Sequence, residues 1–388
     1  MKNLKFFIRL FFKLFLIPKI IFAIFRLFLS KKIIDGYVII SPSLSLSGAP
    51  LLSEKIYQKI SKIKPCFFIS IFGGCEISVN NKKSINFNGI EYKLFYFLTS
   101  LILKRKGYNR FIFNSIVSAK HIKNLKSNDS LIISLIHEMA GVISYFRLEK
   151  KISEIYENSD YLVFSCKDSY EDFIKNISIK KLKNEKFLFL KQGLYENSFI
   201  KNFQKKDYIK SKYRTHLNLS NKQKLVLGIG NDLQRKGFKY FLKLCKICPN
   251  INFIWIGKNK ELKNYKLKNL LIINQVNSDE IYKYFFVSDI FFLSSIEDPF
   301  PTVLLEAMFS GLTVLALKGS GGSDEIIKPE NGLIFEKNNF KEAKNYILKL
   351  DKIKIKKIGD YNHNYVVKNF DFENYIQNLL SVFNKINT

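Results

Sequence analysis

The sequence alternates short apolar runs, rich in β-branched and aromatic residues, with longer helical patterns, and it repeats this alternation in both halves. In the first half we expect strands at Tyr37–Ser41, Phe67–Ile71, Arg110–Phe113, Leu131–Ile136, Tyr161–Ser165 and Phe187–Lys191. In the second half we expect strands at Lys224–Ile229, Ile251–Ile256, Leu270–Ile273, Ile290–Ser294, Thr313–Leu317 and Gly332–Phe335. Alternation of this kind is typical of parallel sheets covered by helices.

The 388 residues are enough for two such domains, each with its own core. We expect an N-terminal Rossmann-like domain over residues 35–200 and a C-terminal one over 223–365, joined by a polar, lysine-rich linker at 201–222. Residues 366–388 read as a final helix that packs back on the N-terminal domain. In doubly wound sheets ligands bind at the carboxyl ends of the strands, so the expected site is a central cleft that both domains face.

Residues 1–34 differ from the rest of the chain because basic residues interrupt every phenylalanine- and leucine-rich run. Four of these basic residues recur at steps of three and four and would share one helix face, namely Lys2, Lys5, Arg9 and Lys13. Lys13, Lys19 and Arg26 disfavour a membrane-spanning helix, and the absence of a small-residue cleavage site disfavours a signal peptide. We favour an amphipathic helix lying on an anionic membrane surface; a spanning helix and a helix packed on the protein are the alternatives.

The formal net charge of +30 predicts an anionic partner such as a phosphorylated substrate, an anionic membrane or a nucleic acid. The lysines are spread along the whole chain, and a codon bias explains them equally well. We therefore predict no nucleic-acid partner.

The five cysteines are too few and too scattered for a disulfide framework, which indicates a reducing, cytoplasmic environment. Cys245 and Cys248 form one C-x-x-C within a helical pattern and have no second pair, so we interpret them as core residues. His137 and Glu138 do not form an H-E-x-x-H motif, and we predict no metal site.

The most informative stretch runs from Ser294 to Met308, where a strand ends and a helix begins. Pro301 suits the first helical position, and the free amides of Thr302 and Val303 would form an anion site for a diphosphate. Glu306 stands among apolar residues, so we expect it to be buried and to have a dedicated partner, either ligand hydroxyls or a protein group.

A glycine-rich turn, Gly228 to Gly237, follows the first strand of the second half. Gly230 would let the backbone approach a ligand, and Arg235 and Lys236 would contact phosphate oxygens. The turn matches neither a Walker loop nor the dinucleotide fingerprint, which disfavours ATP hydrolysis and NAD chemistry. At the end of the strand Leu131–Ile136, the pair His137-Glu138 is expected to point into the cleft.

With these stretches, the chain resembles the retaining family-four glycosyltransferases, which have two Rossmann-like domains in the GT-B arrangement. The resemblance runs from about Tyr37 to Phe370. The E-x7-E motif of that family corresponds to Asp298 and Glu306, although Asp298 is one methylene shorter than the usual glutamate.

The resemblance implies a role for each matched residue. Glu306 would bind the ribose of the donor and Asp298 the transferred sugar, while His137 would lie beside the reacting sugar. The diphosphate would be held by Arg235, Lys236 and the backbone near Phe300, Pro301, Thr302 and Val303. Gly48 belongs to a second glycine turn, in which Ser47 replaces the first glycine of the family.

The implied activity is transfer of a sugar, with retention, from a UDP- or GDP-linked donor to a hydroxyl of a saccharide or lipid-linked saccharide in cell-surface glycan biosynthesis. No cofactor and no metal would be required, and the protein would be peripheral on the inner face of the cell membrane. The alternatives are a nucleotide-sugar epimerase on the same scaffold and a non-enzymatic basic protein that binds membranes or nucleic acid.

Overall fold

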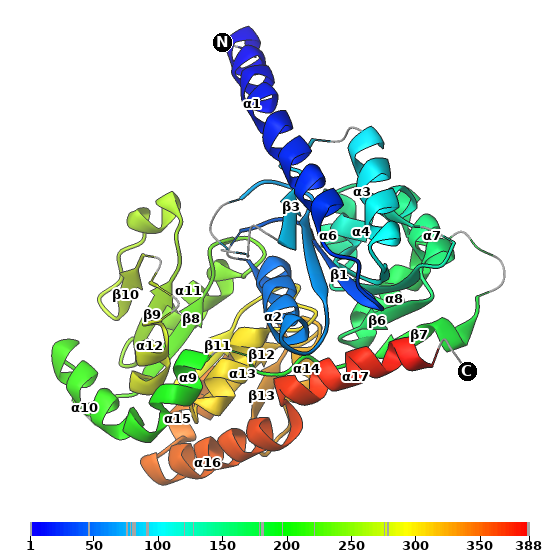
Figure 1. Ribbon diagram of the computed structural model, residues 1–388. Helices are drawn as coiled ribbons and strands as arrows, with labels where there is room; N and C mark the ends of the chain where they lie inside the picture. Colours follow the sequence, from blue (N-terminus) through cyan, green and yellow to red (C-terminus); the bar gives the residue numbers. More distant parts are fainter. Residues whose placement is uncertain are drawn as a thin grey trace. The chain divides into compact units, whose positions relative to one another are not determined.

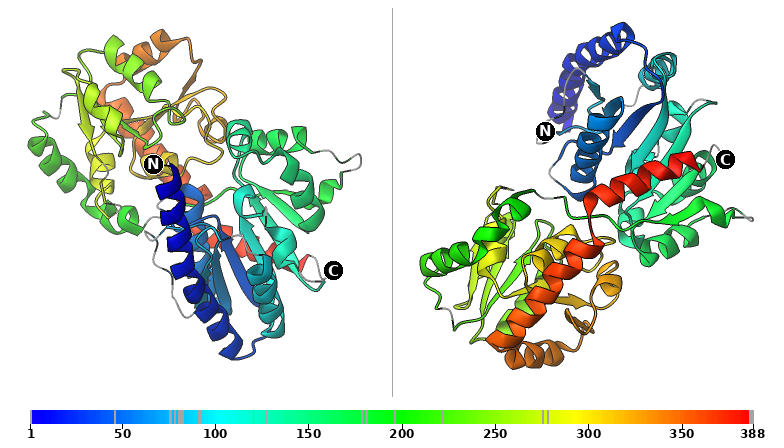
Figure 2. Two further views of the ribbon diagram at one scale, coloured as in Figure 1. Left: turned by 90° about the horizontal axis from the view of Figure 1, so that it is seen from above. Right: turned by 60° about the horizontal axis from the view of Figure 1, so that its bottom comes forward.

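A computed structural model describes residues 2–385, apart from 46, 75, 76, 78, 80–82, 91, 92, 120, 127, 178, 180, 181, 196, 221, 275 and 278, with side chains from residue 16 onward other than 197. The chain divides into two compact units (Figures 1 and 2). Unit 1 holds residues 1–165, 169–190 and 375–388, and unit 2 holds residues 166–168 and 191–374.

Unit 1 is built on a seven-stranded parallel sheet in the order β3-β2-β1-β4-β5-β6-β7. Its strands are β1 (Gly36–Ser41), β2 (Cys66–Ser70), β3 (Ser84–Asn86), β4 (Tyr108–Asn114), β5 (Leu131–Ile136), β6 (Tyr161–Phe164) and β7 (Phe187–Phe189). Its helices are α1 (Lys2–Leu29), α2 (Gly48–Ile63), α3 (Lys93–Arg105), α4 (Ile116–Ala119), α5 (Ile122–Leu125), α6 (Ala140–Tyr145), α7 (Glu149–Asn158), most of α8 (Lys167–Lys175), the short η2 (Asn184–Lys186) and most of α17 (Phe372–Asn384).

Unit 2 is built on a six-stranded parallel sheet in the order β10-β9-β8-β11-β12-β13. Its strands are β8 (Leu225–Ile229), β9 (Asn252–Ile256), β10 (Leu270–Ile273), β11 (Ile290–Leu293), β12 (Thr313–Leu317) and β13 (Gly332–Phe335). Its helices are α9 (Asn197–Asn202), η3 (Phe203–Lys205), α10 (Lys206–His216), α11 (Phe238–Ile247), η4 (Lys260–Asn264), α12 (Tyr282–Val287), α13 (Thr302–Phe309), α14 (Ser323–Ile326), α15 (Phe340–Lys349) and α16 (Lys352–Asn369).

The prediction of two parallel α/β domains is confirmed, and each of the twelve expected strands is present. The sequence does not predict β3, because this edge strand has only three residues, of which Ile85 alone is apolar. A strand so short carries no alternation that a sequence pattern can detect.

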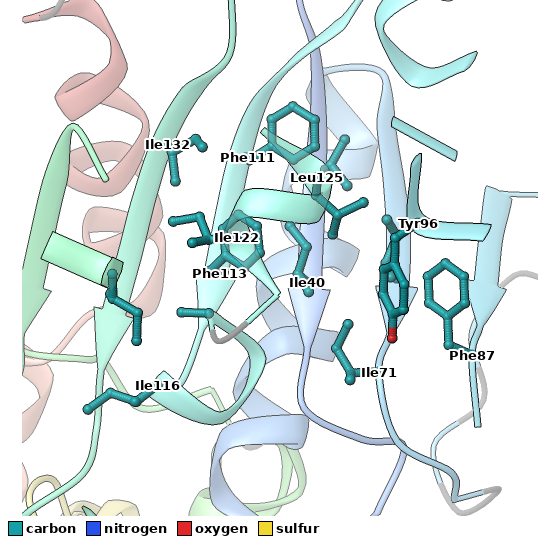
Figure 3. Packing of buried hydrophobic residues seen from close by; sticks show 14 of the residues in the cluster. Ile40, Ile71, Phe87, Tyr96, Phe111, Phe113, Ile116, Ile122, Leu125 and Ile132 are labelled. Atoms are coloured by element: carbon teal, nitrogen blue, oxygen red, sulfur yellow. The ribbon is translucent and has the colours of Figure 1, made fainter. Parts of the chain in front are cut away.

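The core of unit 1 lies between its sheet and the covering helices (Figure 3). Phe111 and Phe113 of β4 face Ile122 and Leu125 of α5, and all four side chains are buried. Tyr96 of α3 stacks on Phe87 with ring centroids 4.1 Å apart. The buried faces of α3 and α5 are therefore held against the sheet, and their opposite faces remain outside.

Residues 201–222, expected to be a linker, are instead part of unit 2. The segment contains α10, in which the Arg214 side chain is 2% exposed and pairs with Asp289 at 2.5 Å. The Arg214 guanidinium also donates to the carbonyls of Ser220 and Gln223. This buried network, which forms only in the folded unit, is the physical reason that a lysine-rich segment is not a free connector.

The N-terminal segment forms one continuous helix, α1, which runs through Pro18. Its second half packs on the protein, the alternative that the sequence analysis did not favour: Ile20, Ile24 and Leu27 are buried in the core of unit 1. The first turns of α1 project beyond the rest of unit 1 (Figure 1). Within the described residues, no helix combines the length and apolar character needed to cross a membrane.

We predict that Ile20→Ala lowers the free energy of unfolding by about 2–4 kcal/mol, because it removes a side chain that is 1% exposed from the core of unit 1. Urea unfolding measures this loss. Ile21→Ala is the matched control, since Ile21 is 51% exposed, and it is expected to change stability by less than about 0.5 kcal/mol. Equal effects of the two substitutions would contradict the packing of α1 on unit 1.

Candidate active site

In unit 2 the candidate residues gather where β8, β11 and β12, three neighbouring strands, end. The loop after β11 leads from Ser294 to Pro301 and into α13. Pro301 is the N-cap residue and Thr302 the first residue of α13, one position later than the sequence predicted. The first-turn amides of α13 therefore begin at Thr302, at the end of a strand, as an anion site requires.

An ion pair between Lys236 and Asp298 joins the loop after β8 to the loop after β11, with Nζ and Oδ2 2.5 Å apart. The side chains are 18% and 9% exposed. Ser295 donates a further hydrogen bond to the same carboxylate at 3.4 Å. From the sequence, these two residues are expected at different parts of a ligand. Their contact depends on the neighbouring positions of β8 and β11, which the sequence does not reveal.

The loop after β8 is shaped by Asp232 and by two glycines. The carboxylate of Asp232 accepts hydrogen bonds from the amides of Gln234 and Arg235, at 3.1 and 3.0 Å. A Cβ at Gly230 would lie 2.5 Å from Cβ of Lys236, and one at Gly237 would lie 1.8 Å from the carbonyl oxygen of Ser294. Gly230 thus makes room for the Lys236 side chain, whereas the sequence predicts that it makes room for a ligand.

Arg235 is attached to the same loop by backbone and side chain. Its Nη1 donates to the carbonyl of Glu297 at 3.2 Å, and its own carbonyl accepts from the amide of Ile296 at 2.8 Å. The Arg235 side chain is 39% exposed. A guanidinium has five N–H donors, so this anchored group can still present donors to a phosphate.

The expectation that Glu306 is buried was wrong. Glu306 is partly exposed together with Thr302 and Val303, which lie on the same face of α13 one turn earlier. The apolar residues around it in the sequence occupy the other faces of the helix and enter the core. Phe300 also packs in the core, 8% exposed, so only its backbone is available at this loop.

A third loop, Gly319–Ser323 after β12, completes this group and was not singled out from the sequence. The amide of Asp298 donates to the carbonyl of Ser320 at 2.7 Å, and the amide of Gly322 donates to the carbonyl of Asp298 at 3.1 Å. A Cβ at Gly322 would lie 2.3 Å from the Pro299 carbonyl oxygen. The signal in the sequence is the run Gly319-Ser320-Gly321-Gly322, one residue after an apolar strand.

In unit 1, His137 follows β5 and is hydrogen-bonded through Nε2 to Oδ1 of Asn114 at 2.7 Å. The amide nitrogen of Asn114 donates to the carbonyl of Ala49 and to the hydroxyl of Ser53. Because this orients the Asn114 oxygen toward the ring, Nε2 of His137 is the donor. Burial lowers the pKa of His137 to about 4, so the ring is neutral near pH 7 and Nδ1 is its acceptor nitrogen.

Glu138 is 4% exposed and turns into unit 1 instead of pointing outward with His137. Its carboxylate accepts hydrogen bonds from the hydroxyl of Ser115 and from the amides of Ile116 and His137, both at 3.0 Å. Burial raises the pKa of Glu138, and these hydrogen bonds oppose the rise. Glu138 therefore fixes the backbone that carries His137.

Gly48 is the first residue of α2, and a Cβ there would meet no atom within 4 Å. Asn114 links this turn to His137 through the Ala49 carbonyl. Asn114 was not selected from the sequence, although it directly follows a predicted strand. The structure thus brings Gly48 and His137 together in unit 1, and Arg235, Lys236, Asp298 and the start of α13 together in unit 2.

Among the described residues, no three His, Cys, Asp or Glu side chains gather as metal ligands. Cys245 and Cys248 are buried, free thiols in the core of unit 2, as predicted. Cys75 lies outside the described residues.

Residues 209–365 match the family described as glycosyl transferases group 1, and this match contains all the candidate residues of unit 2. The predicted resemblance to the family-four glycosyltransferases is confirmed. The matched segment begins within α10, in agreement with the assignment of that helix to unit 2.

Two relatives show how far the group 1 similarity extends. An uncharacterized glycosyltransferase of Haemophilus influenzae is 34% identical over 130 residues, which are 31% of this chain and 37% of the relative. The processive diacylglycerol alpha-glucosyltransferase of Acholeplasma laidlawii is 32% identical over 113 residues, which are 26% of this chain and 34% of the relative. The chain therefore spans about a third of the length of these relatives.

The fold of both units matches solved GT-B glycosyltransferases, which confirms the predicted fold. HepE of Anabaena in complex with UDP-glucose superimposes with a TM-score of 0.73 and 15% sequence identity, over 90% of this chain and 99% of HepE.

We predict that Lys236 and Asp298 are strongly coupled in stability. Lys236→Met leaves a nearly buried carboxylate without its cation and is expected to cost about 1–3 kcal/mol of unfolding free energy. Asp298→Asn in the same chain should recover at least half of that loss. A double-mutant cycle measured by chemical unfolding tests this coupling. Additive single effects would contradict the ion pair.

We predict that His137 makes stability depend on pH between about 6.5 and 4. The ordinary pKa is 6.5 and burial lowers it to about 4 in the folded protein. On acidification the unfolded chain therefore binds the proton at a higher pH than the folded protein does. The contribution of neutral His137 to the free energy of unfolding is fully present above pH 6.5 and is lost as the pH falls toward 4. Unfolding free energies of the wild type should fall more steeply over this interval than those of His137→Gln. His216→Gln, at an exposed position, should keep the wild-type slope.

Proposed function

We propose that this protein transfers a sugar, with retention of configuration, from a nucleoside-diphosphate sugar to a hydroxyl of a saccharide or lipid-linked saccharide. The observation that carries the proposal is the convergence of Arg235, Lys236 and the N-terminus of α13 on one loop of unit 2. Two side-chain cations and a helix N-terminus at the ends of parallel strands suit a diphosphate.

The structural neighbour and the relatives support the donor class. HepE was solved with UDP-glucose, and the Acholeplasma relative is named a diacylglycerol alpha-glucosyltransferase. UDP-glucose is itself an α-glycoside, so an α-linked product corresponds to retention. For this chain we propose a UDP-linked donor first and a GDP-linked donor second.

Catalysis would rest mainly on stabilising the departing diphosphate. Negative charge grows on the leaving phosphate as the bond to the sugar breaks, and the guanidinium of Arg235, the ammonium of Lys236 and the amides of Thr302 and Val303 would oppose it. Each well-placed donor contributes about 2.7–4 kcal/mol by analogy with oxyanion holes. Lys236 has three N–H donors, so its contact with Asp298 leaves others for phosphate oxygens. No metal and no cofactor enters this scheme.

Two carboxylates would position the donor. Glu306, partly exposed on the open face of α13, would accept hydrogen bonds from the ribose hydroxyls. Asp298 engages Lys236 through Oδ2, and its other oxygen would accept from a hydroxyl of the transferred sugar. The contact with the Lys236 ammonium thus orients the carboxylate for that role.

In unit 1, His137 would accept a hydrogen bond at Nδ1 from a hydroxyl of the reacting sugar. The neutral ring and the tautomer set by Asn114 suit an acceptor. Gly48, at the open first turn of α2, would let the substrate approach the backbone. The acceptor hydroxyl would attack on the face from which the diphosphate leaves and would pass its proton to that leaving phosphate.

We also propose that the protein is peripheral on an anionic cytoplasmic membrane surface and that residues 1–34 contribute to binding. Removal of the entire segment would delete Ile20, Ile24 and Leu27 from the core of unit 1. The suitable test is removal of residues 2–15 alone, with co-sedimentation on anionic vesicles. Unchanged sedimentation would refute a contribution of these residues to membrane binding.

We predict that Arg235→Met weakens binding of UDP about 10- to 100-fold, because it removes a charge-assisted hydrogen bond to the diphosphate. Isothermal titration calorimetry in the presence of EDTA measures this change. Lys239→Met removes a nearby exposed cation that lies over the ring of Tyr240, and it should bind UDP as the wild type does. If no nucleoside diphosphate binds the wild type, the proposed function is rejected.

A further inference from the structure

Two helices of unit 1, α1 and α3, expose large apolar side chains on their outer faces. They carry nine of the 22 large apolar side chains that are exposed in the described part of the chain, namely Ile21, Phe22, Phe25, Phe28, Leu29, Leu94, Phe97, Leu98 and Leu101. Scattered exposed apolar residues need no explanation, but a group of this size on two adjoining helices indicates a contact surface. We call these nine residues the α1–α3 face.

The two helices are tied together at their C-terminal ends. Lys106, directly after α3, lies over the Phe28 ring at 5.8 Å and donates to the carbonyl of Ser30. The amide of Ile33 donates to the carbonyl of Lys106 at 2.8 Å, and Gly107 has a φ of 89° where a Cβ would meet the Ile33 carbonyl at 1.9 Å. These contacts fix α1 and α3 as neighbours within unit 1.

The opposite sides of both helices pack into the core of unit 1. Tyr96 of α3 stacks on Phe87, and Leu125 of α5 is buried beside the same sheet (Figure 3). Ile20, Ile24 and Leu27 of α1 join the same cluster. The exposed residues of the α1–α3 face therefore cannot turn inward without displacing buried ones.

The charge around this face has a single sign in the sequence. Residues 1–34 and 93–126 each contain eight Lys or Arg residues and no Asp or Glu. Nearby acidic side chains compensate only in part: Asp129 pairs with Lys104 at 2.8 Å, and Glu154 lies 3.7 Å from Lys123. The partner of this face must therefore be both apolar and anionic.

Beside the α1–α3 face, α3 and α5 border a groove of about 730 Å³. Lys93, Lys104, Lys123 and Lys126 line it together with Leu94 and Phe97. Ammonium groups around an apolar wall suit a ligand that has a phosphate at one end and hydrocarbon at the other.

We propose that the α1–α3 face docks on an anionic phospholipid bilayer and that the groove between α3 and α5 takes the phosphate of a lipid headgroup. Exposed phenylalanine and leucine side chains contact the acyl region, and the surrounding lysines and arginines contact the headgroups. Duplex nucleic acid fits less well, because its bases are already stacked and its phosphate exterior offers no apolar layer for the exposed phenylalanine and leucine side chains. This inference rests on the membrane proposal above and extends the binding surface to α3, outside the N-terminal segment.

Co-sedimentation of the full chain with vesicles of phosphatidylcholine, with and without phosphatidylglycerol, tests the proposal. We expect binding only to the anionic vesicles. Lys93→Glu with Lys126→Glu should lower the vesicle partition coefficient at least about tenfold, because each cation near an anionic surface contributes about fivefold. Leu94→Ser with Phe97→Ser should lower it by a similar factor through loss of apolar contact.

Lys352→Glu with Lys356→Glu is the matched control, since both residues are exposed on α16 of unit 2 and the change in net charge is the same. It should bind vesicles as the wild type does. Thermal unfolding and UDP binding of every variant verify that the fold and the donor site are intact, so a failure of the donor proposal is seen separately. Wild-type vesicle binding by both the lysine and the apolar double variant would overturn the proposal, as would tighter binding to duplex DNA than to anionic vesicles.

Discussion

The candidate site depends on one interaction, the ion pair between Lys236 and Asp298. It exists because β8 and β11 are neighbours in a parallel sheet, so the loops that follow them leave at the same edge. Hydrogen bonds from Asp298 to the loop after β12 extend the connection to a third strand. A pair that is largely shielded from water holds its two side chains in place, and the site can then offer a cation and an anion at fixed positions before any ligand arrives.

In unit 1 a hydrogen bond between two uncharged side chains, Asn114 and His137, has the corresponding role. Asn114 ends β4 and His137 follows β5, the neighbouring strand, and their hydrogen bond sets the tautomer of the imidazole ring. Glu138 turns inward and holds the backbone of the same loop through three hydrogen bonds. In both units a buried polar contact between adjacent strand ends orients a side chain that can act on a ligand.

The two sides of the N-terminal helix α1 lie in different environments, one in the core of unit 1 and one exposed. Ile20, Ile24 and Leu27 complete the core of unit 1, while Phe22, Phe25 and Phe28 on the outer side remain exposed. The helix therefore cannot be treated as a separable anchor, because its removal also opens the core. Its outer side and α3 together combine apolar and cationic character, as binding to an anionic lipid surface requires.

The sequence by itself determined the twelve main strands, the parallel α/β class, and the strand-to-helix turns that carry Arg235, Lys236, Pro301 and Gly48, because periodicity and turn chemistry are local. Only the tertiary structure decided the exposure of Glu306, the Lys236–Asp298 contact, the role of Asn114 and the inclusion of α10 in unit 2. These features depend on which strands are neighbours and which face of a helix meets the sheet. Contacts between residues 23 to 75 positions apart leave no periodic signal in a single sequence.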